Sequence, residues 1–127
     1  MRRSILIAFV LVGGLLVARS SSAQSVTIND YGSNTGAAYG SLGQAFRDNN
    51  SSYIGCTVDA SPGGTEAASC YAQGTSSWVY GSCYTTDAAI IRVIGQLTTD
   101  SSVYFAWDSS GYCSYVDVDE YSSNLPK

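Results

Sequence analysis

The chain contains no histidine in its 127 residues, and this absence excludes several kinds of chemistry. No imidazole base can stand beside a serine or cysteine nucleophile, so the common hydrolytic triads cannot form. Zinc sites with imidazole ligands are excluded too, and an all-cysteine site needs closely spaced pairs. The four cysteines are instead widely separated, at Cys56, Cys70, Cys83 and Cys113. We therefore predict that the protein is not an enzyme and has no catalytic residues, metal or cofactor.

The sequence also lacks an apolar run that would make a good membrane span. Residues 5–18 are almost all apolar, but Arg19 ends the run before the roughly 20 residues that a bilayer requires. A basic pair precedes this run, and small residues follow it. The order is typical of a secretory signal peptide. We predict a signal peptide at 1–23, cleavage before Gln24, and a secreted, periplasmic or cell-surface location with no membrane span.

Positive charge is scarce as well. After cleavage, the three cations Arg47, Arg92 and Lys127 stand against ten acidic residues, a net charge of −7. This balance disfavours binding to a phosphate backbone or to an anionic membrane surface. The expected partner is therefore an extracellular protein or a polysaccharide, not a nucleic acid.

Two hairpins stand out among the residues that are present. The ranges 53–60 and 66–73 flank a Ser-Pro-Gly-Gly-Thr turn, and a turn centred on Gly63 places the apolar residues of both strands on one face. The ranges 102–107 and 112–119 flank an Asp-Ser-Ser-Gly loop. Pairing Trp107 with Tyr112 places Phe105 on one face of that hairpin and Cys113 on the other.

The cysteines have three possible pairings. The first hairpin brings Cys56 opposite Cys70, which predicts the disulfides Cys56–Cys70 and Cys83–Cys113. A third strand predicted at 78–85 can also bring Cys83 opposite Cys70. The alternative of Cys70–Cys83 with Cys56–Cys113 therefore stays open.

One helix is predicted at 86–97. Thr85, Thr86 and Asp87 are capping residues, and apolar side chains recur after them at helical spacing. A buried strand is the alternative, because isoleucine and valine dominate and Gly95 interrupts the run. We predict an α+β fold, with an antiparallel sheet of about five strands in hairpins, one helix and two disulfides.

The chain divides into three parts on this interpretation. Residues 1–23 are the signal peptide, and residues 53–127 form the disulfide-bonded domain of sheet and helix. Residues 24–52 are predicted to be poorly structured, with a short strand at 26–28 and at most one helical turn near 37–46, because glycines weaken any helix there.

Aromatic residues are unusually frequent, with ten tyrosines and two tryptophans. In the predicted meander, several of them project from the sheet face opposite the cysteines. Such flat strips stack on sugar rings or make protein contacts. The alternative is that the rings form the core of a domain with few leucines. The candidate binding surface consists of Tyr53, Tyr71, Trp78, Tyr80 and Trp107.

Acidic residues cluster at the end of the last predicted strand. Asp117 and Asp119 share a face about 7 Å apart, and Glu120 is adjacent. Two carboxylates at this spacing occur in glycosidases, and two or three can hold calcium weakly. A solvated strand edge is the interpretation we favour, because no ligand from another segment converges on the run.

The C-terminal half resembles a loose group of uncharacterised small secreted bacterial proteins with two disulfides. The resemblance rests on residues 82–87, on 103–108 and on Gly111-Tyr112-Cys113. It implies export and disulfides, and it assigns no activity and no functional residue.

Together these observations predict a secreted, non-enzymatic small protein that acts as a binding or cell-surface module. One alternative is a carbohydrate-binding module that uses exposed tyrosine and tryptophan. Another is an inhibitor of a secreted hydrolase, which would present the loop at 61–65 or at 108–111. Ligand and oligomeric state are not determined by the sequence.

Overall fold

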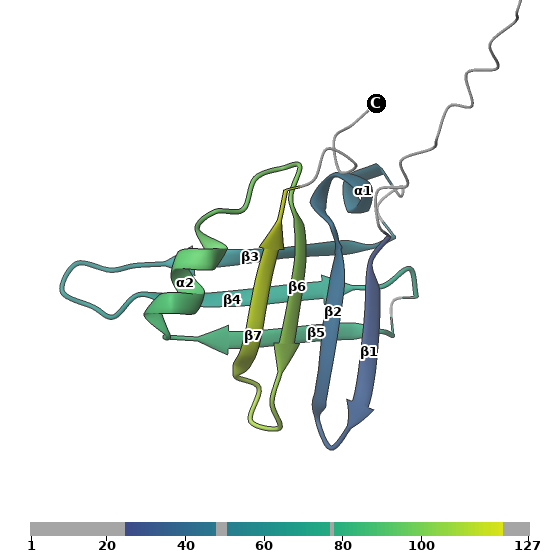
Figure 1. The fold of residues 1–127 in the computed structure, drawn as a ribbon. Helices are drawn as coiled ribbons and strands as arrows, with labels where there is room; N and C mark the ends of the chain where they lie inside the picture. The colour runs from purple at the N-terminus through teal and green to yellow at the C-terminus, as the bar shows by residue number, and fades with distance from the viewer. Residues whose placement is uncertain (1–24, 48–50, 77, 121–127) are drawn as a thin grey trace, which may run out of the picture.

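The computed structural model describes residues 25–47, 51–76 and 78–120. Over these residues the chain forms two antiparallel sheets, which lie face to face as two layers with their strands crossing (Figure 1). Crossed layers of this kind are the orthogonal form of a β-sandwich. The predicted signal peptide at 1–23 lies outside the described residues.

The two sheets are formed by different parts of the chain. The four-stranded sheet has the order β1 (Thr27–Gly32), β2 (Thr35–Ser41), β6 (Ser102–Trp107) and β7 (Cys113–Asp119). The three-stranded sheet is a simple meander of β3 (Tyr53–Asp59), β4 (Ala67–Gln73) and β5 (Tyr80–Thr85). The N-terminal hairpin therefore pairs with the C-terminal hairpin in one sheet, and the middle of the chain forms the other sheet.

The core lies between the sheets and is built mainly from small and medium side chains. Phe105 is the largest fully buried side chain among the described residues, with 0 % of its surface exposed. The same buried cluster contains alanines from both sheets, and small side chains allow the layers to approach closely. The buried core residues include Ala38, Ile54, Ala68, Cys70, Ala72, Cys83, Ile91, Ile94, Val103, Cys113 and Val116.

The first hairpin confirms the predicted register. Cys56 is paired with Cys70, and Ile54 is paired with Ala72. Side chains point alternately to the inner and the outer face along the whole of β4, and Ala68, Cys70 and Ala72 are the buried ones. This alternation sets the register, because a slip by one residue would expose all three.

The second hairpin differs from its predicted pairing along its whole length, because pairing Trp107 with Tyr112 would have set Phe105 opposite Ser114. Phe105 is paired with Val116, and Trp107 is paired with Cys113, with a register shift between Ala106 and Trp107. A bulge of this kind places an extra residue in one strand and turns the following side chains to the other face. The prediction that Cys113 lies opposite the face of Phe105 is therefore wrong. The bulge turns Cys113 into the core.

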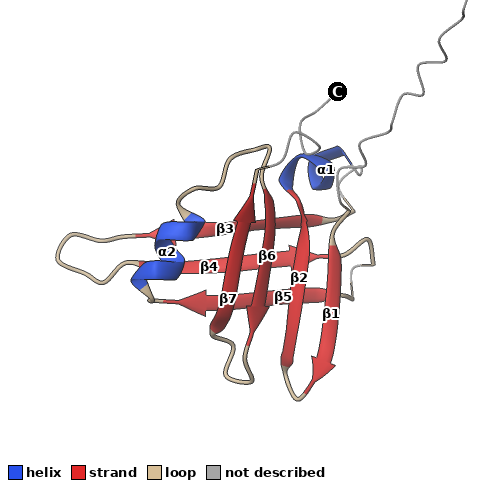
Figure 2. Ribbon diagram, viewed as in Figure 1, coloured by secondary structure: helices blue, strands red, loops and turns tan. Residues whose placement is uncertain are grey.

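Helix α2 (Ala88–Ile94) confirms the predicted helix but is shorter at both ends. Asp87 caps it, since its Oδ1 atom accepts hydrogen bonds from the backbone N–H groups of Ala89 and Ile90. After Ile94 the chain tightens into bonds between residues three apart, which ends the regular helix. Figure 2 shows α2 beside β7, where it covers the ends of β3 and β4.

The segment predicted to be poorly structured contains regular elements. Within 24–52 lie β1, β2 and helix α1 (Leu42–Arg47). Ala37 and Ala38 are fully buried on opposite faces of β2, which is an inner strand of its sheet. The small residues that weaken a helix here fit a strand that is covered on both faces. Pairing with β6 stabilises this strand, although its residues have little strand propensity of their own.

The α+β class, the antiparallel strands and the two disulfides are confirmed. The described residues form seven strands in two sheets, because the N-terminal hairpin adds two that were not expected as a pair. Among the described residues, none of the helices is both long enough and apolar enough to cross a membrane.

Candidate binding groove

A groove of about 410 Å³ lies where the edge of the three-stranded sheet meets the N-terminal hairpin. Its volume is within the range of small-ligand sites. We call it the aromatic groove; the residues that define it are Asp30, Asn34, Trp78, Tyr80, Ser82 and Trp107. Ile28, Val79 and Gly81 complete its lining. Three of the five residues predicted from sequence as a binding surface therefore meet here.

Trp107 forms the inner wall of the groove and is held in place by two glycines. A Cβ atom built on Gly81 of β5 would lie 2.6 Å from Cη2 of the indole. A Cβ atom built on Gly36 of β2 would also collide with this ring. Because neither glycine has a side chain, the indole fits between the two sheets. Trp107 is half-buried and packs against the core, whereas the predicted binding surface lay on the sheet face opposite the cysteines.

Trp78 stands at the opposite rim and is almost completely exposed, with 93 % of its surface open to solvent. Tyr80, two residues later, is 50 % exposed at the edge strand β5. A tryptophan in this position contributes little to the core, and large exposed apolar surfaces mark interaction sites. The groove thus has one fixed aromatic wall and one open aromatic rim.

Polar groups of the groove come from both sheets. Asp30 belongs to β1, and its Oδ1 atom accepts a hydrogen bond of 2.8 Å from the backbone N–H of Gly32. Asn34 follows in the β1–β2 turn, where it adopts a left-handed conformation with φ of 60°. Sequence analysis missed Asp30 and Asn34, because their segment was expected to lack regular structure. The turn-forming sequence Gly32-Ser33-Asn34 was the available signal for a hairpin there.

Tyr80 connects the groove to the outer face of the three-stranded sheet. Burial raises the pKa of its phenol above the ordinary value of 10.0, a hydrogen bond with the Ser82 side chain opposes this, and nearby Tyr53 and Tyr71 add to the rise. The phenol is therefore neutral at physiological pH and available as both donor and acceptor.

Tyr53 and Tyr71, the other two predicted residues, lie on that outer face. They border a shallow hollow of about 370 Å³ along β3, together with Gly55, which has open space where a side chain would stand. The predicted set is thus divided between the hollow and the groove, with Tyr80 between them.

The tyrosines are surface residues. All nine that the structure describes are exposed or half-buried. The described tyrosine rings therefore do not form the core, which was the alternative. Two further pairs extend the aromatic surface beyond the predicted set: Tyr84 and Tyr112 have ring centroids 6.2 Å apart, and Tyr104 and Tyr115 have centroids 5.8 Å apart.

Glu120, at the end of the acidic run, has a structural role. Oε1 of Glu120 accepts hydrogen bonds from the hydroxyls of Thr98 (2.9 Å) and Ser101 (3.1 Å). Ser101 is fully buried. This carboxylate ties the loop that follows α2 to the last strand.

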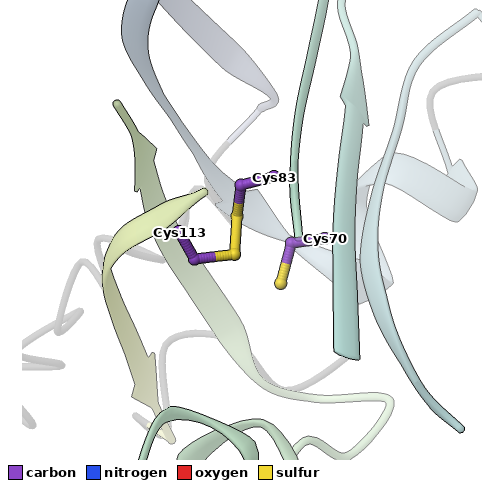
Figure 3. A group of neighbouring side chains, drawn as sticks. All are labelled: Cys70, Cys83 and Cys113. Atoms are coloured by element: carbon purple, nitrogen blue, oxygen red, sulfur yellow. A yellow bond between two sulfur atoms is a disulfide. The ribbon is translucent and has the colours of Figure 1, made fainter. Parts of the chain in front are cut away.

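Both predicted disulfides are present and lie close together in the core. Cys56–Cys70 joins neighbouring strands of one sheet, and Cys83–Cys113 joins the two sheets. The sulfurs of Cys70, Cys83 and Cys113 all lie within 4.8 Å of one another (Figure 3). Since all of these sulfurs are bonded in pairs, they are not thiolate ligands for a metal.

Comparison with protein-family models, with curated proteins and with solved structures finds no match for this chain. Its function must therefore be argued from the groove.

Proposed function

We propose that this chain is an exported, non-enzymatic carbohydrate-binding protein that stacks sugar rings in the aromatic groove. The single observation that carries the proposal is the convergence of Trp78, Tyr80 and Trp107 on one cavity of about 410 Å³ that Asp30 and Asn34 also line. Aromatic faces bind the apolar faces of sugar rings, and carboxylate and amide groups bind their hydroxyls. The groove supplies both kinds of contact.

The composition narrows the ligand to neutral sugars. Asp30 places a carboxylate at the groove, and the chain after residue 23 has a net charge of −7 from three cations and ten acidic residues. Uronic acids and sulfated sugars would be repelled. The absence of histidine from the sequence and the proposed signal peptide at 1–23 support a binding role outside the cell.

The test is a titration of the full chain with soluble neutral oligosaccharides, namely gluco-, xylo-, manno- and chito-oligomers, followed by tryptophan fluorescence. At least one series should change the emission saturably. Trp78→Ala should weaken that binding about tenfold or more, because tryptophan is enriched among the residues that contribute most to binding energy. Folding should survive, since the ring is 93 % exposed.

Tyr115→Ala is the matched control, because this ring is also exposed but lies on the outer face of the other sheet. It should bind like the wild type. The proposal fails if no neutral oligomer changes the fluorescence, or if the Trp78 and Tyr115 variants lose affinity equally.

A second candidate, inhibition of a secreted hydrolase, is favoured by one observation. The loop between β6 and β7 is held rigid by Asp108, whose Oδ1 atom accepts hydrogen bonds from the backbone N–H groups of Ser110 and Tyr112. Rigid loops suit insertion into a cleft because little entropy is lost. An inhibitor would titrate a glycosidase or protease stoichiometrically, and Asp108→Ala would weaken it while sparing sugar binding.

A further inference from the structure

The two disulfides are positioned to exchange partners. Cys70 is the register partner of Cys56 on one side and of Cys83 on the other, since β4 is the middle strand of its sheet. Its sulfur also lies within 4.8 Å of the sulfurs of both Cys83 and Cys113. Figure 3 shows this sulfur beside the Cys83–Cys113 bridge. If the Cys56–Cys70 bond opens, Cys70 becomes a thiol next to an intact disulfide.

The bridge is accessible from one end. Cys70 is completely buried, whereas Cys56 is half-buried on the edge strand β3. Cys56 also borders the hollow of about 370 Å³ beside Tyr53 and Gly55, and Gly55 presents no side chain there. A small thiol therefore reaches Cys56 before it reaches any of the three buried cysteines.

We propose that Cys56 is a thiol-reactive site and that Cys70 relays the exchange to the second bridge. The thiolate of a small thiol attacks Sγ of Cys56, forms a mixed disulfide and releases Cys70 as a thiolate. Cys70 then attacks Sγ of Cys83, forms the Cys70–Cys83 disulfide and expels Cys113 as a thiolate, which takes a proton from water. One thiol is consumed, the number of disulfides stays at two, and no net oxidation or reduction of the protein occurs.

The product and the starting state differ in which strands the disulfides connect. Cys83–Cys113 links the two sheets, whereas Cys70–Cys83 lies within the three-stranded sheet. The exchange therefore removes the covalent link between the sheets. This inference does not depend on what the aromatic groove binds.

The sharpest test is the Cys56→Ser variant of the full chain, in which Cys70 is a thiol without any added reductant. After incubation at about pH 8, where thiolates are populated, the thiols are trapped with N-ethylmaleimide in denaturant at mildly acidic pH and located by peptide mass analysis. About one-tenth or more of the molecules should carry the label on Cys113. Label confined to Cys70, or found on Cys83, would overturn the proposal.

Cys70→Ser is the matched control, because it leaves Cys56 as the free cysteine and removes the relay. Its label should stay on Cys56, and label on Cys113 here would also contradict the proposed path. A measurement on the wild type covers the case in which a variant does not fold. Limiting glutathione should give glutathione on Cys56 and maleimide on Cys113, and maleimide on Cys70 would count against the relay.

Discussion

The indole of Trp107 lies against the backbone of Gly81 in the facing sheet, so closely that a Cβ atom on Gly81 would stand 2.6 Å from the ring. This contact determines how near the two sheets approach at the groove. It also explains why an aromatic residue at the end of β6 is only half-buried, with one part of its ring in the core and another in the groove wall.

Gly81→Ala should therefore destabilise the protein and disturb the groove together. Overpacking of this kind costs about 1–3 kcal/mol, and urea unfolding measures it. Gly55→Ala is the control, since nothing lies within 4 Å of the added methyl group and its φ is not in the left-handed region. The Gly55 variant should be as stable as the wild type or slightly more so. Equal losses in the two variants would disprove the close contact.

The two disulfides should contribute unequally to stability. Cys83–Cys113 closes a sequence separation of 30 residues and Cys56–Cys70 one of 14. Loop entropy gives about 3.7 and about 3 kcal/mol for the two closures. Replacing both members of a pair with alanine, followed by urea unfolding without reductant, should show the larger loss for the inter-sheet bridge. The reverse order would mean that strain or residual structure outweighs loop entropy.

The sequence contains enough information for the meander and favours the disulfide pairing that forms, but it does not predict the sandwich. The register of β3 and β4 follows from alternation around a single turn, which is a local signal. The pairing of β2 with β6 joins residues such as Ala38 and Phe105, which are far apart in the sequence. Residues 35–41 carry no sequence signal for pairing with β6, because alanine and glycine have weak strand preferences of their own.

The groove was predictable only in part for the same reason. Strand alternation placed Trp78 and Tyr80 together on the sheet face opposite the cysteines, but it did not determine which face of the sheet is exposed. Asp30 and Asn34 reach the groove only because the N-terminal hairpin packs over the edge of the other sheet. The bulge before Cys113 also escaped prediction, since a bulge leaves no mark in the alternation of so short a strand.

Removing the cap of α2 should weaken the helix. Asp87→Ala loses the acceptor for two backbone N–H groups, at 2.8 and 3.1 Å, and should cost about 1 kcal/mol in free energy of unfolding. Asp87→Asn retains an oxygen acceptor and should cost much less. Thermal or urea unfolding of the three proteins distinguishes them. Similar losses in the alanine and asparagine variants would show that charge, not capping, is what Asp87 contributes.

Alkaline pH should destabilise the protein partly through Tyr80. Burial raises the pKa of this phenol, with Tyr53 and Tyr71 adding to the rise, so the folded state holds its proton when the unfolded state, with a pKa of about 10, has released it. The free energy of unfolding therefore falls as pH rises above that value. Tyr80→Phe should make the free energy of unfolding decrease less steeply with pH. Tyr104, whose pKa is also raised by burial, still contributes to the decrease in that variant. At neutral pH both proteins carry an uncharged ring, so the difference measured there reports the hydroxyl alone. An unchanged slope in urea unfolding across the alkaline range would show that Tyr80 ionises alike in both states.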